Sequence, residues 1–297
     1  MRGNMRDSDK KDLEMINLYK KELYPAGKAA DRQEPFTWKD AAHAVAPALL
    51  YTALANVVYS LFFQALAGRQ VSGLLLQAAT SAVCLGISGW WISRKEKIRL
   101  WSGSRTVYRF PAFFCYVSGV VMWGIGWNQI IYLTRLKEAS GGYQRVTAVF
   151  YGNSLFLEIL ALCILAPLVE ELVYRGMVYS RFRKKGGRLL SITGSALVFG
   201  LLHFNLVQCI YAAAAGLLLA YIVEQTGSIA TAAAAHGTMN LVSVIWTETD
   251  WLDVLNQTGL KLYLLTGGCL CLAVVFVLDG NRLTKKDVGK KDKLISY

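Results

Sequence analysis

Long uninterrupted apolar runs are the feature that most limits what this chain can fold into. Each run is near the roughly 17–25 residues that a helix needs to cross about 30 Å of hydrocarbon. The runs do not alternate apolar with polar residues, as the strands of a membrane β-barrel do. The sequence therefore predicts an all-α, polytopic membrane helix bundle of about eight transmembrane helices. The eight runs cover residues 41–66, 71–92, 111–133, 159–179, 189–204, 206–223, 229–246 and 260–278.

Composition agrees with a membrane protein and argues against a nucleic-acid partner. Hydrophobic residues make up 54% of the chain and the mean hydropathy is +0.35, more apolar than an ordinary soluble domain. The net charge of +12 suits basic residues that flank spans and meet anionic lipid. No module combines basic with aromatic residues as nucleic-acid-binding domains do. We expect a lipid bilayer around the chain and no nucleic acid.

The distribution of Lys and Arg predicts the orientation of the bundle. With eight spans, the tails and connections on the side of the N-terminus carry 26 of these residues, and the opposite side carries 5. The positive-inside rule then places both termini in the cytoplasm, with the bundle in the cell (plasma) membrane. We expect a cytoplasmic tail over residues 1–39, one membrane domain over 40–280 and a basic cytoplasmic tail over 281–297. The boundary between the fifth and sixth spans is predicted at residues 203–205.

The fourth apolar run contains charged residues, which are costly in a membrane and therefore mark a functional site. Glu170 and Glu171 are adjacent, and Arg175 follows four residues after Glu171. On a helix, Glu171 and Arg175 lie on one face and can form an ion pair. Glu170 is rotated by about 100° from Glu171. We therefore expect one neutralised carboxylate and one, Glu170, with no cation beside it.

Two of the three histidines also lie in apolar helices of the second half of the chain. Phe199 precedes His203 by four residues, and Asn240 follows His236 by four, so each pair shares a helical face. Asn240 can both donate and accept hydrogen bonds. Because the three motifs fall at compatible depths in three spans, we expect them to form one intramembrane site.

These motifs, taken in order, resemble a known family. The pattern Glu170-Glu171-x-x-x-Arg175, then Phe199-x-x-x-His203, then His236-x-x-x-Asn240 is similar to that of the CPBP (CAAX protease and bacteriocin-processing, Abi-type) intramembrane proteases. These are relatives of the type II CAAX prenyl endopeptidases. The resemblance covers about residues 155–245. We expect this segment to form the catalytic core of the membrane domain.

The residues allow peptide-bond hydrolysis inside the membrane, and the resemblance implies the same assignment. An unpaired, desolvated Glu170 suits a general base that activates water, and His203 can hold the same water. His236 and Asn240 can donate to the developing oxyanion. Glu171 and Arg175 would orient Glu170. A site within the bilayer favours a membrane-associated substrate: a prenylated C-terminal peptide, a leader or bacteriocin peptide, or a transmembrane segment.

A zinc ion is the alternative to a metal-free mechanism. Glu170, His203 and His236 are a plausible set of ligands for catalytic zinc. However, no H-E-x-x-H helix is present, and the three groups come from separate spans. The resemblance implies a metal-independent glutamate mechanism, so we expect no cofactor.

Two non-hydrolytic hypotheses compete with the protease. The buried polar residues would also suit a membrane immunity or scaffold protein, in which they form helix–helix contacts. A proton-coupled transporter using Glu170 is the third hypothesis. It is disfavoured because the sequence has no inverted repeat and no matched pair of interrupted spans.

Overall fold

The computed structural model describes residues 35–96, 110–249, 251 and 258–295, and its regular structure within these ranges is helical. Segments labelled η are π-helical, with hydrogen bonds that reach back five residues. The all-α prediction is confirmed for the described residues, and residues 1–34 of the expected N-terminal tail lie outside them. The elements are α2 (Trp38–Ala65), α3 (Gly73–Trp91), η1 (Ile92–Glu96), α4 (Phe110–Leu133), α5 (Leu136–Ala139), α6 (Gly141–Phe150), α7 (Leu155–Glu158), η2 (Ile159–Leu165), α8 (Ala166–Glu171), η3 (Leu172–Tyr179), α9 (Ser180–Leu201), α10 (Leu206–Thr226), α11 (Ile229–Glu248) and α12 (Gly259–Ile295).

All eight predicted apolar runs are mainly helical, and six helices in the described residues are long and apolar enough to cross a membrane. The fourth and fifth runs lie in the path 155–201, which consists of α and π segments and in which the helical dihedral angles are interrupted once. This path changes direction at Gly187, where φ is +72°. The count of eight spans and the side of each terminus stay predictions. The six helices are Trp38–Ala65, Gly73–Arg94, Phe110–Leu133, Leu206–Thr226, Ile229–Glu248 and Gly259–Thr284.

The predicted break between the fifth and sixth runs is confirmed. Helix α9 ends at Leu201, and in the turn that follows Phe204 adopts a φ of +56°, which is rare for a bulky residue. The Asn205 side chain then accepts a hydrogen bond from the Gln208 N–H at 2.9 Å and caps α10. The expectation that His203 lies inside a helix is wrong: the positive φ that follows it leaves His203 in the turn.

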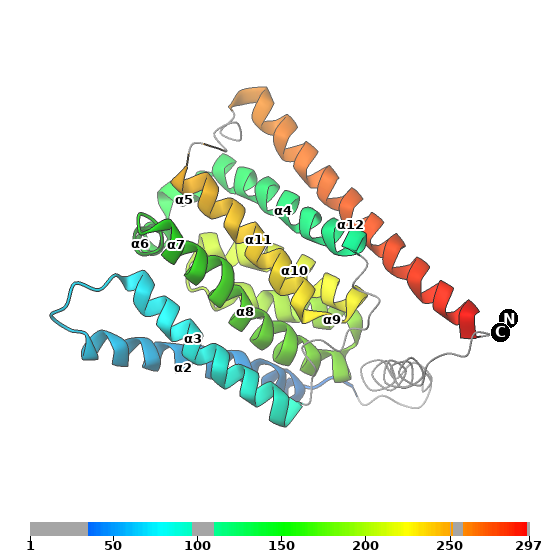
Figure 1. Ribbon diagram of the computed structural model, residues 1–297, viewed down its shortest axis with the longest axis horizontal. Helices are drawn as coiled ribbons and strands as arrows, with labels where there is room; N and C mark the ends of the chain where they lie inside the picture. The colour runs from blue at the N-terminus through cyan, green and yellow to red at the C-terminus, as the bar shows by residue number, and fades with distance from the viewer. Residues whose placement is uncertain (1–34, 97–109, 250, 252–257, 296–297) are drawn as a thin grey trace.

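The helices form two outer pairs around a central group, as Figure 1 shows: α12 lies along α4, and α2 lies beside α3. Between the pairs are α10, α11 and the path 155–201. Small residues allow the α4–α12 contact, because a Cβ on Gly119 would come within 2.9 Å of Val277 and one on Gly126 within 2.7 Å of Leu270. Tyr116 of α4 also donates to Asn281 of α12 at 2.9 Å.

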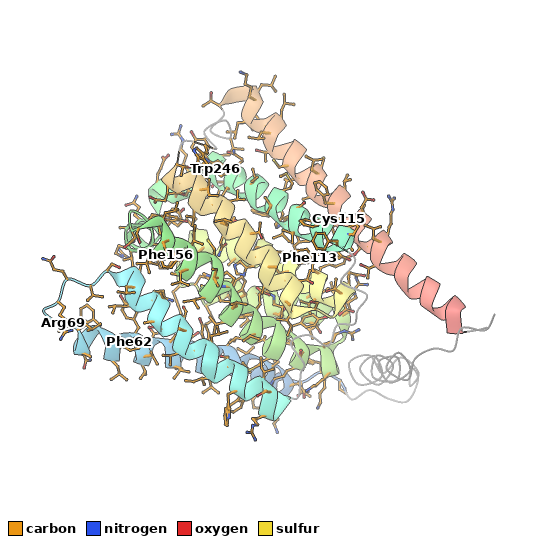
Figure 2. All side chains as sticks on the ribbon, viewed as in Figure 1. Phe62, Arg69, Phe113, Cys115, Phe156 and Trp246 are labelled. Atoms are coloured by element: carbon orange, nitrogen blue, oxygen red, sulfur yellow. The ribbon has the colours of Figure 1, made fainter. Side chains whose placement is uncertain are left out.

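The outer surface is apolar. In α2, only Ala44, Pro47 and Ala48 are buried. Large side chains point away from the bundle; Phe156 (Figure 2), for example, is 76% exposed. A surface of this kind suits hydrocarbon, since a soluble monomer rarely exposes large contiguous apolar areas.

A local change of helical register explains how α11 is held against the path 155–201. In η2, the Ala166 N–H donates to the carbonyl of Ala161, five residues back, so it does not donate to the Leu162 carbonyl. Residue 167, which would be the π-helical donor for Leu162, is proline and has no N–H. The freed Leu162 carbonyl accepts instead from the Asn240 side chain at 2.8 Å. A buried carbonyl without a helical partner is thus satisfied by α11.

Gly237 permits this close approach. It lies where α11 faces Cys163. The carbonyl of Cys163 also lacks a helical donor, because the residue four positions later is Pro167, which has no N–H. A Cβ on Gly237 would come within 2.3 Å of the Cys163 carbonyl oxygen. That separation is far below contact distance, so any larger residue must push the two backbones apart.

We predict that Gly237→Ala destabilises the bundle by about 1–3 kcal/mol, the usual cost of overpacking a close contact. Unfolding in detergent micelles, followed by denaturant or heat, measures the difference. Gly267→Ala is the matched control, because a Cβ there meets nothing within 4 Å on the exposed side of α12. The control is expected to be neutral or slightly stabilising. Equal stability of the two variants would contradict the close contact.

Candidate active site

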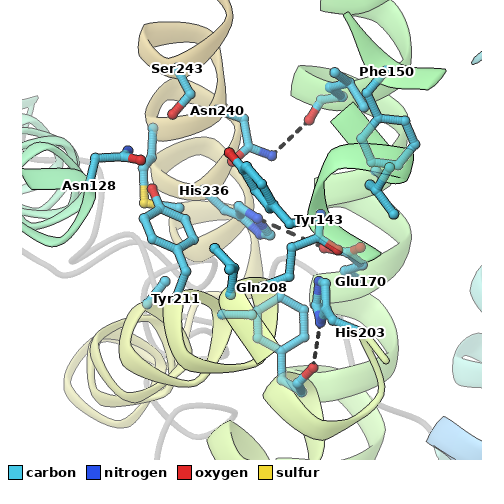
Figure 3. Close-up of a pocket in the computed structure, with 18 of the residues that line it drawn as sticks. Asn128, Tyr143, Phe150, Glu170, His203, Gln208, Tyr211, His236, Asn240 and Ser243 are labelled. Atoms are coloured by element: carbon cyan, nitrogen blue, oxygen red, sulfur yellow. Dashed lines mark hydrogen bonds and ion pairs between the residues drawn. The ribbon is translucent and has the colours of Figure 1, made fainter. Parts of the chain in front are cut away.

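A cavity of about 930 Å³ lies between the central helices and collects the predicted residues. Glu170 enters it from α8, His203 from the turn after α9, and His236 and Asn240 from α11 (Figure 3). Phe199 also lines it. Three motifs that are separate in sequence therefore line one cavity, and the catalytic roles of their residues stay a prediction.

Glu171 and Arg175 form the predicted pair behind the cavity wall. Arg175 Nη1 donates to Glu171 Oε1 at 2.9 Å, and both side chains are fully buried. Arg175 Nη2 also donates to the Gly216 carbonyl of α10 at 3.2 Å. Burying two charges is offset only by such pairing and hydrogen bonding, so this pair ties the η3 segment to α10.

His236 completes this buried group. Its Nδ1 lies 3.0 Å from Glu171 Oε1, the same oxygen that binds Arg175. An ionised carboxylate only accepts hydrogen bonds, so Nδ1 carries a proton. The other nitrogen, Nε2, lies 3.8 Å from Glu170 Oε2. The expectation that Glu170 has no cation nearby is therefore incomplete, because a protonated His236, contributed by another helix, would be that cation.

His203 is fixed in the same way. Its Nδ1 lies 2.7 Å from the Phe199 carbonyl oxygen, which can only accept, so Nδ1 carries the proton. In the neutral ring, Nε2 is then a hydrogen-bond acceptor. Both histidines thus have Nδ1 engaged with protein, which leaves Nε2 as the reactive atom.

Phe199 packs against three of the functional side chains. Its ring is edge-on to His203, with centroids 4.9 Å apart, and to His236 at 5.9 Å. The Arg175 guanidinium lies over the ring at 4.8 Å, a cation–π contact. The shared face of Phe199 and His203 is confirmed. The sequence did not reveal that the same ring also orders the other two side chains.

Asn240 has a structural role besides the predicted role as an oxyanion donor. One of its N–H groups is bound to the Leu162 carbonyl, so at most one remains to donate to an oxyanion. His236 can donate from Nε2 only when it is protonated, because Nδ1 is already bound to Glu171. The predicted oxyanion donors are therefore limited to one N–H each.

The zinc alternative requires Glu170, His203 and His236 to converge on one metal ion. Within the part of the chain that the structure describes, no group of three or more His, Cys, Asp or Glu side chains is arranged to hold a metal ion. Glu170 and His236 approach each other, and with Nδ1 held by a protein acceptor each histidine keeps Nε2, the nitrogen that would bind a metal ion. The metal-free mechanism stays a prediction, which a chelation experiment tests below.

Sequence reasoning missed a second polar group in the cavity. One signal was available: His236, Asn240, Ser243 and Thr247 are spaced four, three and four residues apart, so they form one stripe along α11. No comparable pattern marks the residues from the other helices. The additional polar lining residues include Asn128, Lys137, Tyr143, Gln208, Tyr211, Ser243 and Thr247.

Comparison with known proteins agrees with the motifs. Residues 152–242 match the family model described as type II CAAX prenyl endopeptidase Rce1-like. The "Putative membrane peptidase YdiL" of Bacillus subtilis (strain 168) is 26% identical over 112 residues, which are 38% of this chain and 46% of that protein. The chain thus spans a little under half the length of this curated relative. No solved structure matches the chain.

The family match includes all three motifs, so the resemblance to the CPBP proteases is confirmed over this segment. The six apolar helices of the described residues also indicate a membrane protein. Together they make the chain a multi-pass membrane protein.

We predict that Arg175→Met destabilises the protein by about 3–5 kcal/mol, because it leaves the Glu171 charge buried with less compensation. The double variant Glu171→Gln with Arg175→Met removes both charges and is expected to lose less than the sum of the single changes. Unfolding in detergent measures all three variants.

Arg282→Met is the control for this cycle. Arg282 forms an exposed pair with Asp279 at 3.0 Å, and an exposed pair contributes only about 0–1 kcal/mol. Additive losses in the cycle, or a loss for Arg175→Met no larger than for Arg282→Met, would contradict the coupling.

Proposed function

We propose that this chain is an intramembrane endopeptidase of the glutamate type, which hydrolyses a peptide bond of a membrane-associated or lipidated protein or peptide. One observation carries the proposal. Glu170 shares a cavity with two histidines whose Nδ1 atoms are held by protein acceptors, so that both Nε2 atoms remain for chemistry. The match to type II CAAX prenyl endopeptidases supports the same reaction class.

In the proposed first step, Glu170 acts as general base. Its carboxylate accepts a proton from a water molecule, while Nε2 of neutral His203 accepts a hydrogen bond from the second O–H group, whose hydrogen stays on the attacking oxygen. The oxygen, now nucleophilic, attacks the scissile carbonyl carbon. Proton transfer by a positioned side chain contributes typically about 10²–10⁴-fold to rate.

In the second step, the charge on the carbonyl oxygen is stabilised and the amine leaves. Protonated His236 donates from Nε2, and Asn240 donates from the N–H that Leu162 does not use. Glu170 returns the proton it took from water to the leaving nitrogen, so the carboxylate is regenerated as the C–N bond breaks. Glu171 keeps His236 oriented through Nδ1, and it is a positioning residue.

The substrate class follows from the surroundings of the site. The residues lie among apolar helices, so the substrate must reach them from the bilayer or its surface. A CAAX-type C-terminal peptide, or a leader or bacteriocin peptide, meets this requirement.

We predict that Glu170→Gln lowers hydrolysis by at least about 10²-fold, since the amide cannot take the proton. His203→Ala is expected to lower it as well. The measurement compares peptide termini in cells that carry each variant at equal membrane levels. Glu138→Gln, an exposed glutamate outside the cavity lining, is the control and should keep wild-type termini. A cellular phenotype that persists in Glu170→Gln, with no terminus changed, would support the immunity or scaffold role instead.

We also predict that hydrolysis survives removal of metal. Purified protein is treated with a strong chelator, its zinc content is measured, and cleavage of a peptide identified in cells is followed. Activity within about twofold of untreated protein is expected, because the mechanism needs no Lewis acid to activate water. Activity that disappears on chelation and returns only with added zinc would establish the zinc alternative.

A further inference from the structure

The buried carboxylate of Glu158 is one that the proposed mechanism does not use. Glu158 is the last residue of α7 and its side chain is fully buried. Its Oε1 accepts a hydrogen bond from the Asn153 N–H at 2.9 Å, whereas Oε2 is buried and has no hydrogen-bond partner among the described residues. No described Lys, Arg or His forms an ion pair with it. An ionised oxygen that is buried without a donor is uncommon and requires a physical explanation.

A second carboxylate, that of Glu248, lies beside Glu158. Glu248 is the last residue of α11, and its Oε1 accepts from the Gly152 N–H at 3.1 Å. The same N–H group also faces Glu158. Because Gly152 and Asn153 are adjacent, two carboxylates from two helices hold neighbouring N–H groups of one turn, 151–154. This turn is therefore fixed by two acceptors that repel each other when both are ionised.

A proton on Glu158 relieves both the missing donor and the repulsion. Protonated at Oε2, the carboxyl group becomes a hydrogen-bond donor, and the Glu248 carboxylate is an acceptor next to it. Burial raises the pKa of Glu158 above its ordinary value of 4.5, and the charge of Glu248 adds to this rise. The two N–H groups oppose the rise only in part. The geometry and the direction of this pKa agree that Glu158 holds its proton to higher pH than an exposed glutamate.

The other groups around Glu158 do not titrate in the same range. α7 packs against η2 and α3, whose titratable side chains are the thiols of Cys163 and Cys84. Tyr151 of the turn is a further neighbour. Thiols and phenols have ordinary pKa values of about 8.5 and 10, so they are mainly neutral below about pH 8. His236 lies twelve residues before the end of α11, about 18 Å away at 1.5 Å per residue.

The turn 151–154 connects the cover of the cavity to the path that carries Glu170. The Asn153 side chain donates to the Val149 carbonyl at 3.1 Å and so joins the turn to the end of α6. A change in how firmly the turn is held therefore reaches helix α6. The residues of α6 that line the cavity are Tyr143, Val146 and Phe150.

We propose that Glu158 and Glu248 form a proton-operated latch, which fixes the turn 151–154 and helix α6 when Glu158 is protonated and loosens them when it is ionised. The latch regulates access to the cavity, and it is independent of whether the cavity hydrolyses peptides. Since the pKa of Glu158 is raised in the closed turn, the latch gives its full stability below the ordinary value of 4.5. That stability is lost as the pH rises through the raised value.

Hydrogen–deuterium exchange of the backbone amides tests the latch. Full-length protein in detergent, with a chelator present, is equilibrated at several pH values between about 5 and 8, and exchange rates are corrected for the intrinsic effect of pH. The protection of residues 143–154 is expected to fall by at least about threefold from the acid to the alkaline end, because ionisation of Glu158 opens the turn. Amides in the middle of α10 serve as an internal reference and should keep their protection.

Variants assign the pH dependence to the two carboxylates. In Glu158→Gln, the side-chain amide donates to Glu248 as the protonated acid does. Protection at about pH 8 is therefore expected within about twofold of that of wild type at about pH 5. Glu248→Gln removes the neighbouring charge and should move the fall in protection to lower pH. Glu138→Gln, an exposed glutamate of α5, is the matched control and should keep the pH dependence of wild type.

Protection of residues 143–154 that does not change with pH, or that rises with pH, would overturn the latch. A pH dependence that persists in Glu158→Gln would do the same, because the histidines remain in that variant. If Glu158→Gln does not fold, Glu248→Gln decides, and an unchanged midpoint of its pH dependence overturns the latch. Without chelator, protection that millimolar calcium restores at about pH 8 in wild type but not in Glu248→Gln would assign the carboxylates to a cation instead. None of these measurements involves cleavage, so the latch and the protease can fail separately.

Discussion

The structure depends on one buried carboxylate, that of Glu171. A single oxygen accepts from Arg175 on its own helical path and from His236 on α11. Because a carboxylate in an apolar interior must be compensated, this oxygen draws two elements together and also keeps a proton on His236 Nδ1. Arg175 continues the connection to the Gly216 carbonyl on α10 and to the ring of Phe199. The adjacent Glu170 is then left at the cavity wall, where a carboxylate can react.

The π-helical segments give the site its shape. The shift of register in η2 and the missing N–H of Pro167 release the Leu162 carbonyl, and Asn240 binds it. Gly237 brings α11 close enough for that bond. The motif residues thus have two roles. Glu170 and His203 face the cavity, whereas Glu171, Arg175 and one N–H group of Asn240 stabilise its walls.

Much of the site could be predicted from sequence because the cost of charge in an apolar span is visible in the order of residues. The spacing of Glu171 and Arg175 predicted their ion pair, and the polar residues 203–205 predicted the break before α10. Other predictions were wrong or incomplete for physical reasons. His203 lies in a turn, since Phe204 adopts a positive φ that no pattern indicates. His236 has its Nδ1 bound to Glu171, a partner 65 residues away.

The sequence by itself determined the helical membrane class, the residues capable of chemistry and the pairs within one helix, because these depend on local periodicity and on the cost of buried charge. The tertiary structure alone decided which nitrogen of each histidine remains for chemistry, which carbonyl Asn240 serves, and that Lys137 and Tyr211 share the cavity with Glu170. Those relations depend on how close separate helices come and on their register, which small residues such as Gly237 and the π-helical turns set through packing.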